Sequence, residues 1–227
     1  MAAAGLALPC LGAAGWGLLH TGPFSARVVT VVGAEHTSRA AVVEAAGLAG
    51  HPPLIDVDPG RAAAAVARLP WVLRAEVARH WPDGVQVTVV ERTPRLVVAR
   101  PAGGFAEVDV TGRVLATVAS PPPGLIELHV PVVPGAPGRA VGAGAGPALA
   151  VAATLPRAFA AQVSAIEAGA GGQVDLQLAV PATVRLGSTS QLSVKYEAVA
   201  ALLARGLVHP GDTVDVSVPA APAVSGP

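Results

Sequence analysis

The chain has 227 residues, 52% of them hydrophobic, and a formal net charge of zero at pH 7. This length suffices for one large domain or two small ones, and the apolar content suffices to fill a buried core. The fifteen Lys and Arg residues are scattered along the chain. Because no basic patch is present, the composition argues against nucleic-acid binding.

An apolar run without any charged side chain occupies residues 1–19. A membrane-spanning helix needs about 20 such residues, so the sequence predicts a transmembrane anchor over residues 1–22. A cleavable signal peptide would start with a positive segment, whereas the first basic residue is Arg27. Lipid attachment at Cys10 is disfavoured because Pro9 precedes it, and the lack of Lys or Arg before the run leaves its orientation open.

A strand and two helices are predicted next. Residues 27–33 alternate around valines and form the strand. Ser38 supplies an N-cap for a helix over residues 39–46. A second helix has Asp58 as its N-cap and a proline at its first helical position, and it runs to about Leu69.

A β-hairpin is predicted over residues 71–89, where two alternating runs are joined by the turn at residues 81–84. The first run places four apolar side chains on one side, those of Trp71, Leu73, Ala75 and Val77. Trp71 is therefore expected to be buried, whereas Trp81 lies at the turn.

A junction follows at residues 93–94, because proline interrupts pairing and keeps its predecessor out of the helical region. Beyond it we predict a strand at 96–98, a hairpin of residues 105–110 and 113–118, and an exposed connector at 131–147. The elements predicted after the connector are helices at 148–155 and 158–163, a hairpin of 173–180 and 183–186, a helix at 191–205 and a final strand at 213–218.

Candidate catalytic, cofactor and metal patterns are all incomplete. The glycine-rich residues 142–146 resemble a phosphate loop, but Pro147 replaces the third glycine. A calcium loop starting at Asp56 would have Gly60 and Ala67 at ligand positions. No G-x-S-x-G motif occurs. The six histidines never show the i, i+4 spacing of a helical metal pair: His20, His36, His51, His80, His129 and His209. We predict no enzyme, cofactor, metal or small-molecule substrate.

Several motifs resemble those of the FtsQ/DivIB family of bacterial cell division proteins. Three fall in or after the hairpin: Leu-Pro-Trp-Val at 69–72, Trp-Pro at 81–82 and Glu-Arg-Thr-Pro at 91–94. A fourth, Val-Asp-x-x-Gly-x-Val, occupies 108–114. Shorter similar words occur in the same order at 31–33, 46–48, 53–54 and 57–58.

The resemblance implies an α+β protein: an N-terminal transmembrane helix, a POTRA domain (β-α-α-β-β) and a mixed β domain with flanking helices. Applied to this chain, it places the POTRA domain at 24–92, the β domain at 93–218 and a flexible tail at 219–227. It also implies a single-pass protein of the cell membrane, with its bulk outside the cytoplasm at the division septum.

The function implied by the resemblance is that of a divisome scaffold, which links early and late division proteins and helps to control septal peptidoglycan synthesis. Its partners would be FtsB/DivIC-like and FtsL-like proteins, received at the final strand through main-chain hydrogen bonds. The partner-binding residues carried over are Val214, Asp215, Val216, Ser217, Val218, Lys195 and Tyr196. Core packing of Tyr196 and a solvated Lys195 are open alternatives. The last strand and tail lack the aromatic residue of better-known members.

Two other functions remain open from the sequence. A POTRA-containing secretion or outer-envelope assembly factor would usually show repeated POTRA units or a membrane barrel, and neither is visible. An extracytoplasmic enzyme would need acids, histidines or nucleophiles gathered in one pocket.

Overall fold

The computed structural model describes residue 20 and residues 22–226. The chain divides into two compact units, residues 1–92 and residues 93–227, each with its own hydrophobic core. Among the described residues, no helix has both the length and the apolar character needed to cross a bilayer. The predicted anchor over residues 1–22 lies almost wholly outside the described residues.

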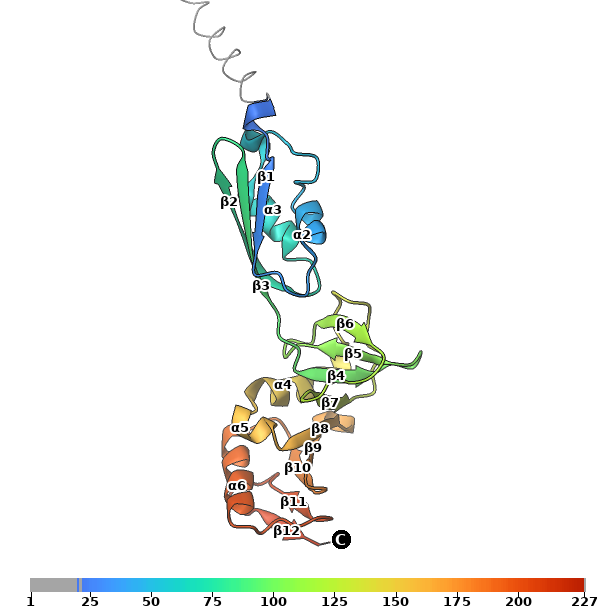
Figure 1. The fold of residues 1–227 in the computed structure, drawn as a ribbon. Coiled ribbons are helices and arrows are strands. Elements are labelled where there is room, and N and C mark those ends of the chain that lie inside the picture. Colours follow the sequence, from blue (N-terminus) through green and yellow to red (C-terminus); the bar gives the residue numbers. More distant parts are fainter. Residues whose placement is uncertain (1–19, 21, 227) are drawn as a thin grey trace, which may run out of the picture. The chain divides into compact units, whose positions relative to one another are not determined.

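The first unit is built on a three-stranded sheet in the order β1-β3-β2 (Figure 1). β1 (Val28–Val32) pairs parallel with β3 (Gly84–Glu91), and β2 (Val72–His80) pairs antiparallel with β3. The predicted hairpin is confirmed. The sheet buries valines of β3 against the two helices of the unit.

Both helices of the first unit begin at the predicted N-caps. Ser38 Oγ accepts a hydrogen bond from the Ala41 N–H at 3.2 Å and starts α2 (Arg39–Ala45). Asp58 Oδ1 accepts from the Arg61 N–H at 3.1 Å and starts α3 (Pro59–Val66). Two short 3₁₀ helices complete the unit, η1 (Gly22–Phe24) and η2 (Leu54–Asp56).

The prediction that Leu73 faces the apolar side of the hairpin is wrong. Val72 pairs with Glu91 but Arg74 pairs with Val90, so Leu73 is an extra residue in a β-bulge. An extra residue reverses the alternation on one side of the bulge. As a result Val72 is fully buried and Leu73 is 51% exposed.

The loop between β1 and α2 is fastened to the end of β3 through Glu91. The Glu91 carboxylate accepts hydrogen bonds from the His36 N–H at 2.9 Å, from His36 Nδ1 at 2.9 Å and from the Thr37 N–H at 2.8 Å. Burial alone would raise the pKa of this carboxyl, but these bonds outweigh burial and lower it to about 2. Trp71 is half-buried and stacks on the His36 ring, with centroids 4.2 Å apart.

The second unit contains one nine-stranded sheet in the order β12-β11-β10-β9-β8-β7-β4-β5-β6 (Figure 1). Its strands are β4 (Leu96–Ala99), β5 (Phe105–Val108), β6 (Val114–Val118), β7 (Ile126–His129), β8 (Val163–Ala168), β9 (Val174–Leu178), β10 (Thr183–Gly187), β11 (Thr213–Asp215) and β12 (Ala223–Ser225).

Two strands that join the halves of this sheet, β7 and β8, were not predicted from the sequence. β7 pairs parallel with both β4 and β8. The partners of a parallel strand lie far apart in the chain, so no hairpin pattern announces them. The helix predicted at residues 158–163 is only α5 (Arg157–Ala160), and the strand β8 starts at Val163.

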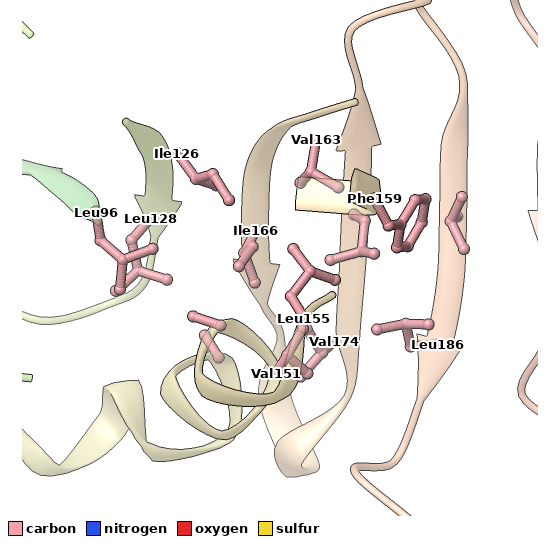
Figure 2. Packing of buried hydrophobic residues seen from close by; sticks show 14 of the residues in the cluster. Leu96, Ile126, Leu128, Val151, Leu155, Phe159, Val163, Ile166, Val174 and Leu186 are labelled. Carbon is pink, nitrogen blue, oxygen red and sulfur yellow. The ribbon is translucent and has the colours of Figure 1, made fainter. Parts of the chain in front are cut away.

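The core of the second unit lies between this sheet and its helices, α4 (Gly146–Thr154), α5 and α6 (Leu192–Ala204). Figure 2 shows side chains of α4, α5 and the residue after α4 packing on β8, β9 and β10. The helix predicted at residues 191–205 is confirmed as α6, and its Tyr196 and Val199 are both buried in this core. Two 3₁₀ turns also occur, η3 (Ala143–Ala145) and η4 (Ala170–Gly172).

The Val-Asp-x-x-Gly motif builds the turn between β5 and β6. Buried Asp109 accepts hydrogen bonds through Oδ1 from the Thr111 N–H at 2.9 Å and the Arg113 N–H at 3.0 Å. Gly112 has a φ of +83°, and a Cβ there would lie 2.6 Å from Leu149 Cδ1. These residues are therefore required by the turn.

Candidate partner-binding edge

The outermost strand at the carboxyl end of the sheet is β12. It pairs antiparallel with β11 through Thr213 with Ser225, Val214 with Val224, and Asp215 with Ala223. Among the described residues, no strand pairs with its other side. All three β12 residues are exposed. A strand with one unpaired side offers main-chain N–H and C=O groups to an added strand.

The expectation that residues 213–218 form the free edge of the sheet is therefore wrong. Residues 213–215 form β11, which is enclosed by β10 on one side and β12 on the other. Residues 216–218 leave the strand, with Val216 buried and Val218 61% exposed. The tail predicted as flexible contains β12, so its residues 223–225 have a defined place.

A tight turn at Asp215 ends β11. Asp215 Oδ1 accepts hydrogen bonds from Ser217 Oγ at 2.6 Å and from the Ser217 N–H at 2.9 Å. These bonds are the main cause that lowers the pKa of Asp215, and Arg185, whose Nη1 lies 3.7 Å from Asp215 Oδ2, adds to the effect. Asp215 and Ser217 thus act within the turn that sends the chain towards β12.

Lys195 is a structural side chain of the second unit. It is 1% exposed, and its Nζ donates to the carbonyl oxygens of Leu186 and Ser188, each at 2.8 Å. Burial lowers the pKa of this amine. Because it donates to main-chain carbonyls at the end of β10, Lys195 joins α6 to the sheet. The alternative of a solvated Lys195 is wrong.

Tyr196 lies in the core next to Phe159, with ring centroids 6.0 Å apart. Its hydroxyl donates to the Val151 carbonyl at 3.2 Å and lies 3.1 Å from Thr154 Oγ1. Burial raises its pKa, and the hydrogen bond with Thr154 opposes that rise. One side of Tyr196 lines a groove of about 1020 Å³ between α5 and α6. The core-packing alternative for this residue is confirmed.

Two rows of side chains run across the sheet and end at β12. The apolar row on the helix side consists of Val184, Val214 and Val224, which pair in register; the first two are fully buried and Val224 is 39% exposed. The row on the opposite face is charged. In register from β7 to β12 it contains His129, Glu167, Asp175, Arg185, Asp215 and Ala223.

The charged row is connected by side-chain contacts. His129 Nδ1 lies 3.4 Å from Glu167 Oε1, while the opposite ring nitrogen lies 3.1 Å from Glu127 Oε2. The pKa of Asp175 is raised first by burial, with Arg185 opposing and the neighbouring acids adding to the rise. The row contains three acids, Glu167, Asp175 and Asp215, and one arginine, Arg185, which lies beside Asp215. The row as a whole is therefore acidic.

The described residues contain no group of three His, Cys, Asp or Glu side chains arranged to hold a metal ion. Asp58, which the sequence placed in a candidate calcium loop, caps α3.

The fold and this edge define a two-unit protein with a POTRA domain and a mixed β domain. Residues 24–92 match the model of the "POTRA domain, FtsQ-type", and residues 96–217 match that of "Cell division protein FtsQ/DivIB, C-terminal". The chain belongs to the FtsQ/DivIB family of cell division proteins.

Relatives named Cell division protein FtsQ occur in several actinobacteria. The one from Streptomyces collinus is 36% identical over 207 residues, which cover 87% of this chain and 76% of the relative. The one from Mycobacterium leprae is 35% identical over 210 residues, which cover 92% of this chain and 58% of the relative. This chain thus spans less than two thirds of the mycobacterial protein.

The outer strand β12 was not predicted from the sequence. Ala223, Val224 and Ser225 lie between Pro222 and Gly226 among small residues, and three residues carry almost no alternation. The one feature that could have indicated a strand here is Val224, an apolar β-branched residue whose neighbours on both sides are small or polar.

Proposed function

We propose that this chain is a single-pass divisome scaffold that links early and late division proteins and helps to control septal peptidoglycan synthesis. Membership in the FtsQ/DivIB family supports the division role. The charge-free residues 1–19 support an anchor in the cell membrane. The orientation, with both units outside the cytoplasm, rests on the family membership. The proposed partners are FtsB/DivIC-like and FtsL-like proteins.

The observation that carries the binding role is the unpaired outer side of β12. An extended segment of the partner would add a tenth strand there through main-chain hydrogen bonds. The predicted site therefore moves outward by one strand, from residues 213–218 to residues 223–225.

The two rows behind β12 give this edge a means of selection. Side chains of an added strand point alternately to the two faces of the sheet. Those beside Val224 would extend the apolar row, and those beside Ala223 would face the acidic row that contains Asp215. We expect a partner segment that alternates between apolar and basic or polar residues.

Photocrosslinking in growing cells tests this edge. A photoreactive residue replaces Ser225 on β12, and a matched control carries it at Thr117 on β6, the strand at the other end of the sheet order. We expect position 225, and not position 117, to capture an FtsB-like or FtsL-like protein. Val224→Pro, which removes a main-chain donor, should abolish the capture.

Two outcomes would contradict the proposal. Capture of no division protein from position 225 in a folded chain would refute the β12 edge. Normal septa after complete depletion of the chain, in a strain without a second copy, would refute the division role itself.

A further inference from the structure

One end of the first unit exposes a large aromatic side chain. Trp81 lies in the turn between β2 and β3 and is 50% exposed. The ring of Phe24, at the end of η1, lies beside it with centroids 6.3 Å apart and an angle of 58°. Figure 1 shows η1 next to this turn. Two further apolar side chains are exposed here, Val28 at 57% and Ile55 at 36%.

Hydrogen bonds hold the start of β1, the turn before β3 and η2 together. The N–H groups of Arg27 and Val28 both donate to the carbonyl of Asp83, at 3.0 and 3.1 Å. Arg79 Nη1 donates to the Ile55 carbonyl at 3.4 Å. Val28 also pairs in register with Gly84, at the start of β3. We call the surface formed by Phe24, Val28, Ile55 and Trp81 the proximal end.

The chain enters the first unit at the proximal end. His20, the first described residue, has its Nε2 3.2 Å from Asp56 Oδ2, next to Ile55. The nineteen residues before it carry no charge. The apolar run therefore ends a few residues before Phe24, whose ring lies beside Trp81.

We propose that the proximal end rests on the membrane surface, with the Trp81 ring at the level of the lipid headgroups. An indole has an apolar body and one N–H donor, and for this reason tryptophan is enriched at membrane interfaces. Contact with the bilayer would cover apolar side chains that the first unit leaves in water. The inference rests on the proposed membrane anchor and adds a fixed orientation of the first unit on the bilayer.

The contact depends on apolar groups and not on charge. Two arginines, Arg27 and Arg79, and two acids, Asp56 and Asp83, lie at or beside the proximal end. Their charges cancel, so attraction to anionic lipid contributes little. We therefore expect the same contact on zwitterionic and on anionic bilayers.

Fluorescence quenching by nitroxide-labelled lipids tests the contact in the full chain reconstituted into zwitterionic vesicles. Trp16→Phe and Trp71→Phe leave Trp81 as the only tryptophan. The control variant also carries Trp81→Phe, and Leu73→Trp places its only tryptophan at the exposed position 73. Position 73 lies about 23 Å from the end of β2 near Trp81, because a strand rises about 3.3 Å per residue.

We expect lipids labelled near the headgroup to quench Trp81 by roughly twofold or more and to leave the control unquenched. Replacing half of the lipid with an anionic one should leave this ratio unchanged. Chains that float with the vesicles but show no quenching of Trp81 would overturn the inference and leave the anchor standing. Quenching that requires anionic lipid would also overturn it.

Chains that do not float with the vesicles would instead refute the proposed anchor. If circular dichroism shows that Trp71→Phe disturbs the fold, a spin-labelled variant that keeps Trp71 is used instead. Trp81→Cys with Cys10→Ala carries a spin label at position 81, and its accessibility to oxygen and to a water-soluble nickel complex is measured. The inference would be overturned if the nickel complex reached the label at position 81 more readily than oxygen does, and as readily as it reaches an exposed label on β2.

Discussion

The contact of Glu91 with the loop after β1 predicts a measurable pH dependence of stability. The substitution is Glu91→Gln, which keeps the shape of the side chain and removes its charge. The pKa of Glu91 falls from 4.5 to about 2 in the folded state. At about 1.4 kcal/mol per pKa unit, the ionised carboxylate contributes about 3 kcal/mol above pH 4.5. Glutamine still accepts hydrogen bonds, so we expect a loss of about 2 kcal/mol at pH 7.

The sign follows from the lowered folded-state pKa. The stabilisation is fully present above the unfolded value of 4.5 and is lost as the pH falls towards 2. The wild-type chain and the variant should therefore differ at pH 7 and converge near pH 2. Because Trp71 and Trp81 lie in the first unit and no tryptophan follows residue 92, the fluorescence of the Trp16→Phe chain during urea unfolding in detergent reports on the first unit.

A matched control is Glu76→Gln, the same change at an exposed position of β2. An exposed charge contributes little, so the control should change the free energy of unfolding by less than about 0.5 kcal/mol. The reasoning would be refuted by equal effects of the two substitutions at pH 7. It would also be refuted by a Glu91→Gln effect that persists undiminished at pH 2.

Two further predictions concern the second unit. Lys195→Met leaves the carbonyls of Leu186 and Ser188 without their donor, so calorimetry of the full chain should show a loss of roughly 1–3 kcal/mol; an unchanged unfolding temperature would contradict the role given to Lys195. Gly112→Ala combines a φ of +83° with a contact of 2.6 Å, whereas Gly124→Ala has a φ of +82° and open space. Both should destabilise by about 1 kcal/mol or more through backbone strain, with Gly112→Ala clearly worse; equal effects would show that the contact with Leu149 relaxes freely.

Local patterns in the sequence predicted local structure well. The N-caps at Ser38 and Asp58 are hydrogen bonds between residues three apart, so a short stretch of sequence contains all the information needed. The same holds for the turn at Asp109. The strands β7 and β8 depend on parallel pairing between residues such as Leu128 and Ile166, which no short stretch contains.

Long-range packing also determines whether the candidate site residues are buried or exposed. Lys195 is the only lysine of the chain, and a lone charged residue on a helix is usually solvated. Its burial depends on the position of two carbonyls, those of Leu186 on β10 and of Ser188 just after it, which cannot be read from the helix itself. The bulge at Leu73 is similar, since it is defined by its pairing with β3.

The one-strand shift of the proposed edge changes which side chains would select a partner. If β11 were outermost, Asp215 would lie directly beside the added strand, but β12 stands between them. Strands in a sheet are about 4.8 Å apart, so Asp215 lies about 10 Å from an added strand and only long side chains reach it. Arginine and lysine have that reach, whereas short polar residues would contact only Ala223 and Ser225. The acidic row therefore favours long basic side chains at alternate positions of the partner segment, and the small residues of β12 leave room for them.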